Sequence, residues 1–191
     1  MAKIKKMKPN KQIYNIPNIL TFSRILIIPV IFFLLFFNKE IYGIAAAFFF
    51  AAAIATDFID GYIARKKNIV TNLGIFLDPI ADKLLVVTIL IMLIPMKRIP
   101  AWVVAVIIFR EIFVTGLRAI ASEKGVVMPA GKEGKWKTAF QMFGILCLLI
   151  YYKHFYLNFG DIGLILIFIS ILFSLISSYK YLKSVSSILL G

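Results

Sequence analysis

The sequence predicts an all-α integral membrane protein with six transmembrane helices. The chain has 191 residues, of which 61% are hydrophobic, and its mean hydropathy is +0.93, well above that of soluble domains. Apolar runs of about 20 residues recur, and a helix of that length crosses a hydrocarbon core roughly 30 Å thick. No long linker or tandem repeat separates the runs, so residues 1–191 are expected to form a single membrane domain.

The predicted spans follow a basic N-terminal segment, residues 1–17, and Pro17 suits the first turn of a helix. They cover residues 18–37, 41–64, 78–96, 99–121, 136–153 and 162–181. Their apolar centres read, in order, ILIIPVIFFLLFF, IYGIAAAFFFAAAIA, LLVVTILIMLIP, WVVAVIIF, FGILCLLIYY and IGLILIFISILFSLI. An even number of spans puts both termini on one side of the membrane.

Lysine and arginine in the termini, in the loops and at the span ends are distributed unequally between the two membrane faces. One face has four of them, Lys39, Lys97, Arg98 and Lys153. The other has Lys3, Lys5, Lys6, Lys8, Lys11, Arg65, Lys66, Lys67, Lys124, Lys132, Lys135, Lys137, Lys180 and Lys183. Because basic residues concentrate in cytosolic loops, both termini of this multi-pass protein of the cytoplasmic membrane are expected in the cytosol. Membrane lipids with anionic headgroups are expected partners, and nucleic acid is not, since no basic domain stands apart from the membrane.

The segment DFIDGYIARKKNIVTNLGIFLDPIAD, residues 57–82, interrupts the apolar pattern with four aspartates. Asp57 and Asp60 are three residues apart near the end of the second span, and Asp78 and Asp82 are four apart at the start of the third. Either spacing puts both acids on the same face of a helix. Two antiparallel helices joined here would bring all four together near the cytosolic face.

Neighbouring carboxylates at a membrane repel each other and resist desolvation unless they are paired or bind cations. A donor set of oxygen atoms, without a nearby histidine or cysteine, favours Mg²⁺ or Mn²⁺ over zinc. Four acids can hold two such ions, and a two-metal site can clamp a phosphoryl group during displacement. The alternative is simple ion pairing with Arg65, Lys66, Lys67 and Lys83.

Two small residues, Gly61 and Ala64, lie on or next to the acidic face, where they leave room for a ligand or for a packed helix. The whole segment has the spacing Asp57-x2-Asp60-Gly61-x2-Ala64-Arg65-x8-Gly74-x3-Asp78-x3-Asp82. This spacing resembles the signature of the CDP-alcohol phosphatidyltransferase family at every fixed position. The resemblance implies a six-helix membrane enzyme, usually a homodimer, that moves a phosphatidyl group from CDP-diacylglycerol to an alcohol and releases CMP.

The resemblance also implies roles for individual residues. Two divalent cations, Mg²⁺ or Mn²⁺, are assigned to Asp57, Asp60, Asp78 and Asp82, of which Asp82 is also the implied base for the acceptor hydroxyl. The cytidine diphosphate end of the donor is assigned to Asp57, Asp60, Gly61, Ala64, Arg65 and Gly74. The N-terminal NIPNILTFSR resembles the branch that uses glycerol 3-phosphate, so Asn18, Thr21 and Arg24 are expected to line the donor's headgroup mouth, or else to serve as interfacial caps.

Charged residues in and after the fourth span suggest an anionic acceptor. Arg110 and Arg118 are eight residues apart and share a helix face, and charges in a span are costly unless they are partnered or face a wet cavity. Lys135 and Lys137 follow in the loop SEKGVVMPAGKEGKWKT, whose last residues overlap the start of the fifth span. Together these four side chains would form a phosphate clamp, although the positive-inside pattern alone also accounts for the lysines.

The segments REIFVTGLR and GKWKTAFQM resemble the branch of the family that uses glycerol 3-phosphate. The expected acceptor is therefore sn-glycerol 3-phosphate, with phosphatidylglycerophosphate as the product. Inositol phosphate or serine is the alternative acceptor, and a cation transporter is the alternative from another class. Glu111 is expected to pair with a cation such as Lys83 or to orient an arginine.

Overall fold

The structure is a computed structural model that describes residues 16–67, 72–123, 126, 131–154 and 156–190. Within its helices and strands, the side chains of residues 16–21, 57–67, 72–76, 78–79, 153–154 and 187–190 lie outside the description. The described residues form α1 (Ile16–Phe36), α2 (Glu40–Lys67), α3 (Asn72–Leu93), α4 (Ala101–Glu123), α5 (Lys132–Ile150), β1 (Lys153–His154), β2 (Leu157–Asn158) and α6 (Phe159–Leu190). The chain divides into two compact units between Met92 and Leu93.

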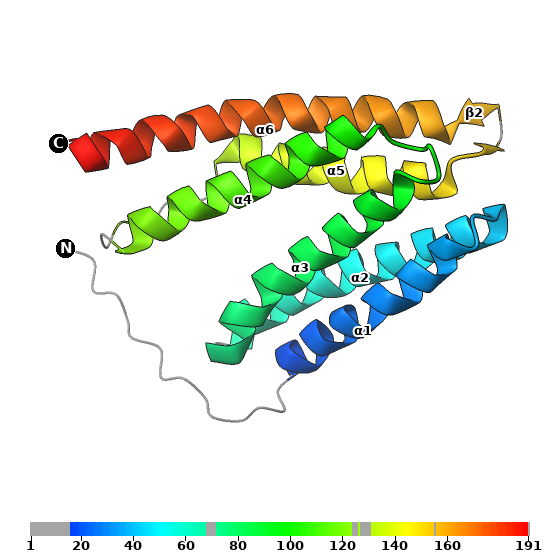
Figure 1. Ribbon diagram of the computed structural model, residues 1–191. Helices are drawn as coiled ribbons and strands as arrows, with labels where there is room; N and C mark the ends of the chain where they lie inside the picture. Colours follow the sequence, from blue (N-terminus) through cyan, green and yellow to red (C-terminus); the bar gives the residue numbers. More distant parts are fainter. Residues whose placement is uncertain (1–15, 68–71, 124–125, 127–130, 155, 191) are drawn as a thin grey trace. The chain divides into compact units, whose positions relative to one another are not determined.

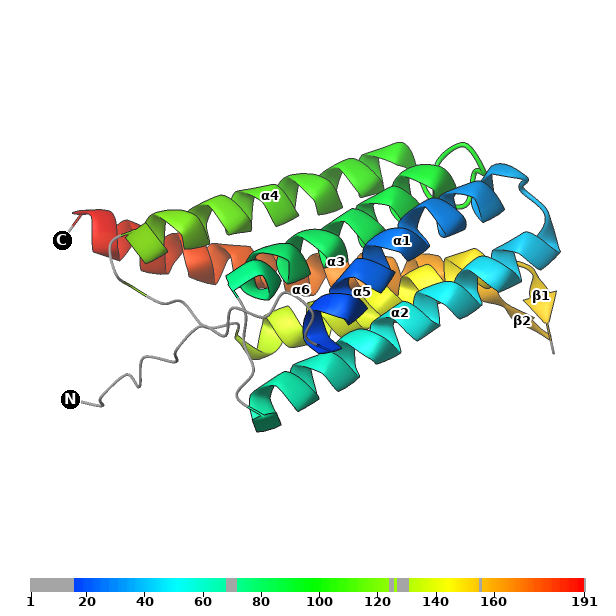
Figure 2. The same cartoon turned by 90° about the horizontal axis from the view of Figure 1, so that it is seen from below.

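The first unit contains α1, α2 and α3, and α1 lies alongside α2 in both views (Figures 1 and 2). A short turn connects these two helices. Asn38 in this turn has a φ of 44°, a left-handed conformation that asparagine tolerates, and its N–H donates to the carbonyl of Leu35 at 3.1 Å. Ile31 of α1 and Phe50 of α2 are fully buried.

The second unit contains α4, α5, the β1–β2 hairpin and α6. The hairpin, which pairs Lys153 with Asn158, reverses the chain so that α6 returns along α5 (Figure 1). Glycines permit the close approach of these two helices. A Cβ added at Gly163 would lie 2.8 Å from Cγ of Leu148 and 3.0 Å from the carbonyl oxygen of Gly144. The register of α5 on α6 therefore depends on Gly144 and Gly163.

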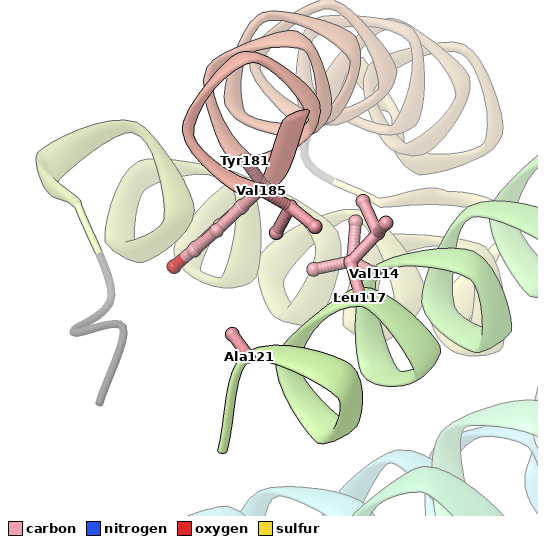
Figure 3. Packing of buried hydrophobic residues seen from close by; sticks show 5 residues of the cluster. All are labelled: Val114, Leu117, Ala121, Tyr181 and Val185. Carbon is pink, nitrogen blue, oxygen red and sulfur yellow. The ribbon is translucent and has the colours of Figure 1, made fainter. Parts of the chain in front are cut away.

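Helix α4 packs on α6 through a small apolar cluster. Figure 3 shows Tyr181 and Val185 of α6 facing Val114, Leu117 and Ala121 of α4. All five side chains are buried. The cluster holds the C-terminal half of α4 against α6. This half contains Arg118 and begins directly after Arg110, the two arginines expected to bind the acceptor.

The six predicted segments all contain helices, but several ends differ from the prediction. α3 begins six residues before the predicted span, α5 begins at Lys132 instead of 136, and α6 continues to Leu190 instead of 181. Hydropathy marks only the apolar part of a helix, so polar end turns escape it. The hairpin was not predicted. Its two-residue strands are too short to show an alternating pattern.

Length and composition identify one membrane-crossing candidate among the described residues, the stretch Phe159–Ser186 of α6. Two shorter apolar stretches, Phe22–Phe36 and Glu40–Thr56, belong to α1 and α2. The protein is thus mostly helical, with one clear apolar span.

Candidate functional site

The residues of the aspartate motif lie on α2 and α3. Asp57 and Asp60 are in the last three turns of α2, and Asp78 and Asp82 are in the second and third turns of α3. Both pairs lie in continuous helix, as the spacing argument required. The other donor-site positions are on the same elements or on α1: Asn18, Thr21, Gly61, Ala64, Arg65 and Gly74. The side chains of these six residues and of Asp57, Asp60 and Asp78 lie outside the described part of the structure.

Asp82 is the one member of the acidic motif whose side chain is described. Its carboxylate is 39% exposed, and its Oδ1 accepts a hydrogen bond from Nη1 of Arg24 at 2.5 Å. Arg24 comes from α1 and is only 2% exposed. This contact joins α1 to α3 at the carboxylate that the resemblance assigns as the base. Arg24 was expected to line the headgroup mouth, and its contact with Asp82 was not predicted.

The chemistry of the acidic motif fits divalent cations. Its donors are carboxylate oxygens, the hard ligands that Mg²⁺ and Mn²⁺ prefer. The Asp82 side chain, hydrogen-bonded to Arg24, remains 39% exposed, so an ion from solution can reach it. The residues present therefore fit the metals that the family uses.

A second polar group lies in the other unit, where α4, α5 and α6 meet. Oε1 of Glu111 accepts hydrogen bonds from Nη1 of Arg110, at 3.0 Å, and from Nζ of Lys137. Nε of Arg110 donates to the hydroxyl of Ser178 at 3.0 Å and to the carbonyl of Ser174 at 3.3 Å. Glu111 therefore orients an arginine, which is one of the two roles that the sequence predicts for it.

Burial makes these contacts strong. Arg110 is 9% exposed and Lys137 is 7% exposed, and a buried cation needs a paired anion or hydrogen-bond acceptors to offset the loss of water. Glu111 supplies the anion, and α6 supplies the two neutral acceptors. Arg110 and Lys137, two of the four predicted clamp residues, are thus brought together through one carboxylate oxygen.

The other two predicted clamp residues are exposed. Arg118 of α4 has its guanidinium over the ring of Tyr181, with Cζ 5.4 Å from the ring centroid. Lys135 lies on α5. The lysines were expected in a loop, but α5 begins at Lys132, so Lys135 and Lys137 are held on a helix. The helix has its N-cap at Gly131, within the polar segment before the predicted fifth span.

Sequence reasoning missed the contribution of α6. Ser174, Ser178 and Tyr181 touch the two arginines of α4 and follow one another at intervals of four and three residues, along one helix face. A signal was present, because this face places hydroxyl groups within an otherwise apolar run. Serines alone, however, are common at helix contacts in membranes.

Comparison with known proteins supports the interpretation of the acidic motif. The family model for CDP-alcohol phosphatidyltransferase matches residues 14–176. A relative from Bacillus subtilis, named CDP-diacylglycerol–glycerol-3-phosphate 3-phosphatidyltransferase, is 38% identical over 183 residues, covering 88% of this chain and 93% of its own. A relative of the same name from Rickettsia typhi is 40% identical over 171 residues, covering 89% and 96%.

A third relative of that name, from Pseudomonas fluorescens, is 42% identical over 143 residues, covering 71% of this chain and 72% of its own. The family match extends from the first turns of α1 into α6, so it includes both the acidic motif and the Arg110–Glu111–Lys137 group. The chain belongs to the CDP-alcohol phosphatidyltransferase family.

Proposed function

We propose that this protein transfers the phosphatidyl group of CDP-diacylglycerol to sn-glycerol 3-phosphate, forming phosphatidylglycerophosphate and CMP. The observation that carries the choice of an anionic acceptor is the meeting of Arg110 and Lys137 from different helices of the second unit. Two buried cations at one place suit a phosphomonoester better than a neutral alcohol such as serine's hydroxyl. The relatives that share this chain's family and most of its length carry the name of the same reaction.

The donor is assigned to the first unit. Its cytidine diphosphate end would be bound by Asn18, Thr21, Asp57, Asp60, Gly61, Ala64, Arg65 and Gly74. Two divalent cations, Mg²⁺ or Mn²⁺, held by Asp57, Asp60, Asp78 and Asp82 would stabilise negative charge on the phosphoryl oxygens and the leaving group. The small residues Gly61 and Ala64 let the donor approach the helix backbone.

The acceptor's phosphate is assigned to the basic residues of the predicted clamp, and the proton of its hydroxyl group is assigned to Asp82. Arg110, Arg118, Lys135 and Lys137 bind the phosphate of glycerol 3-phosphate and thereby orient its free primary hydroxyl. Asp82 accepts the proton of that hydroxyl while its oxygen forms a bond to the phosphorus that bears diacylglycerol. The bond from this phosphorus to CMP breaks, and CMP leaves. Arg24 holds the Asp82 carboxylate in place for this step.

The membrane arrangement is part of the same proposal. Six helices span the cytoplasmic membrane, both termini are cytosolic, and the site opens to the cytosol, where both CMP and glycerol 3-phosphate are soluble. Fourteen basic residues on one face support this orientation. The protein acts as a homodimer among lipids, in keeping with the resemblance of its motif to dimeric family members.

A competition experiment between acceptors tests the reaction. Purified full-length protein is supplied with CDP-diacylglycerol, Mg²⁺ and an equimolar mixture of glycerol 3-phosphate, inositol phosphate and serine, and the lipid products are identified by mass spectrometry. The proposal predicts phosphatidylglycerophosphate as the dominant product. A dominant phosphatidylinositol phosphate or phosphatidylserine would overturn the assignment of the acceptor and leave the donor chemistry standing.

A further inference from the structure

One carboxylate lies between the basic side chains of the second unit. Glu111 neighbours Arg110 in the chain, and adjacent positions on a helix normally point in different directions. Here Arg110 nevertheless reaches Oε1 of Glu111 at 3.0 Å, and Lys137 reaches the same oxygen from α5. The two basic groups therefore share one acceptor atom, which sets the separation between their nitrogen atoms.

Arg110 is also held from its other side. Its Nε donates to Ser178 and to the carbonyl of Ser174, and the Ser178 hydroxyl itself donates to that carbonyl at 2.8 Å. A guanidinium has five N–H donors, and the contacts among the described residues use those on Nε and Nη1. The side chain is thus fixed at two points, and the fork of the guanidinium has a defined direction.

The charges of this group are unequal. Two cations face one anion, so the group has a net charge of +1, and it is largely buried. Without Glu111, two buried like charges would repel each other and separate, or draw in water. With Glu111, they stay side by side and retain a net attraction for an anion.

We propose that Glu111 is a positioning residue for the acceptor's phosphate: its Oε1 holds Arg110 and Lys137 at the spacing at which both donate to a phosphomonoester. The inference rests on the proposed function and names what sets the geometry of its acceptor site. Glu111 acts through its two basic neighbours and repels the phosphate weakly itself. Acceptor affinity therefore depends on a negative charge placed beside the positive ones.

The test replaces Glu111 by an isosteric neutral residue in the full-length enzyme. Glu111→Gln is expected to raise the apparent KM for glycerol 3-phosphate about 10- to 100-fold, the usual effect of weakening one or two charge-assisted hydrogen bonds. The KM for CDP-diacylglycerol should change less than about twofold. Glu123→Gln, the same change at an exposed position of α4, is the matched control and should leave both values unchanged. An unchanged or lowered KM for glycerol 3-phosphate in Glu111→Gln would overturn the inference.

A second comparison separates positioning from a purely structural role. A structural role would reduce the amount of active enzyme and hence the apparent kcat for every substrate, without a selective change of KM. Glu111→Asp keeps the charge on a shorter side chain, so its KM should fall between those of wild type and Glu111→Gln. If Glu111→Gln does not fold, Glu111→Asp alone decides, and a wild-type KM in that variant would contradict the inference.

A double-mutant cycle gives a further readout. If Glu111 acts through Lys137, then Lys137→Met should raise the KM much less in the Glu111→Gln background than in wild type. Full additivity of the two effects would contradict the inference. A wild-type enzyme that does not use glycerol 3-phosphate at all would refute the proposed function. A wild-type enzyme that does use it, with the same KM in the Glu111→Gln variant, would refute only the role of Glu111.

Discussion

At the scale of single residues, Asp82 and Arg24 form the contact on which the proposed proton transfer depends. Arg24 is buried and its guanidinium is 2.5 Å from the Asp82 carboxylate, which remains partly exposed. The arginine fixes the direction of the carboxylate, and the exposed part of the acid can receive a substrate hydroxyl. A general base must lie within about 3 Å of the proton that it removes.

Asp82→Asn preserves the size of the side chain and removes its ability to accept that proton. We expect kcat to fall by roughly 10² or more, a common contribution of a general base, while CDP-diacylglycerol still binds with Mg²⁺. Calorimetric titration of the donor beside a turnover assay measures both quantities. Loss of donor binding together with turnover would make Asp82 chiefly a metal ligand, and retained turnover would place the base elsewhere.

Arg118 offers a test of the acceptor clamp at an exposed position. Its guanidinium lies over the Tyr181 ring. Arg118→Ala therefore removes a proposed phosphate-binding group and leaves the buried side chains of Arg110 and Lys137 in place. The KM for glycerol 3-phosphate should rise about tenfold or more, and that for CDP-diacylglycerol should change little. Lys132→Ala, which removes an exposed charge from the first turn of α5, is the control. A rise in the donor's KM instead would move Arg118 to the donor site.

At the scale of helices, the close packing of α5 on α6 sets the register that brings Lys137 to Glu111. Gly163 and Gly144 are in contact across this interface, and Leu148, next to them, is fully buried. Because protein interiors are densely packed, a single added methyl group at such a contact forces the backbones apart.

Gly163→Ala is therefore expected to destabilise the protein, since its Cβ would lie 2.8 Å from Leu148. Overpacking of this kind costs about 1–3 kcal/mol, which thermal unfolding in detergent would register as a lower midpoint. Gly116→Ala is the matched control, because a Cβ there meets nothing within 4 Å. It should be neutral or slightly stabilising, as alanine is favoured over glycine in a helix. Equal midpoints for the two variants would contradict this account of the α5–α6 contact.

The sequence predicts the helices well and puts the four aspartates in helix, as the structure has them, but it does not predict the contacts of the second polar group, for physical reasons. The spacing of Asp57, Asp60, Asp78 and Asp82 needs only helix geometry to be interpreted. The Arg110–Lys137 pairing depends on how three helices pack, and hydropathy carries no information on that. Lys135 is predicted in a loop because hydropathy marks only the apolar part of the fifth span, yet this lysine lies in the first turn of α5.

At the scale of the whole molecule, the distribution of basic residues predicts the orientation in the membrane. Lys39 lies between α1 and α2, and Glu123 ends α4. The proposed topology puts Lys39 on the face with few basic residues and Glu123 on the basic face. Both residues are exposed, so a cysteine at either position would be accessible to reagents on its own side of the membrane.

In a Cys147→Ser background, Lys39→Cys should react with a membrane-impermeant maleimide added to intact cells. Glu123→Cys should react only after the membrane is permeabilised. Mass spectrometry of the labelled protein measures both. Labelling of Glu123→Cys in intact cells, with Lys39→Cys protected, would reverse the proposed topology and put the site on the outer face.

The central claim is that the aspartates of α2 and α3 catalyse a metal-dependent release of CMP. The most direct test measures CMP formation from CDP-diacylglycerol and glycerol 3-phosphate with and without excess chelator. We expect release with Mg²⁺ or Mn²⁺ in wild type and in Asp161→Asn, a control at an exposed aspartate of α6. Release should be abolished by the chelator, by Asp57→Asn and by Asp78→Asn. Full activity in excess chelator, or in either of these two variants, would contradict the claim.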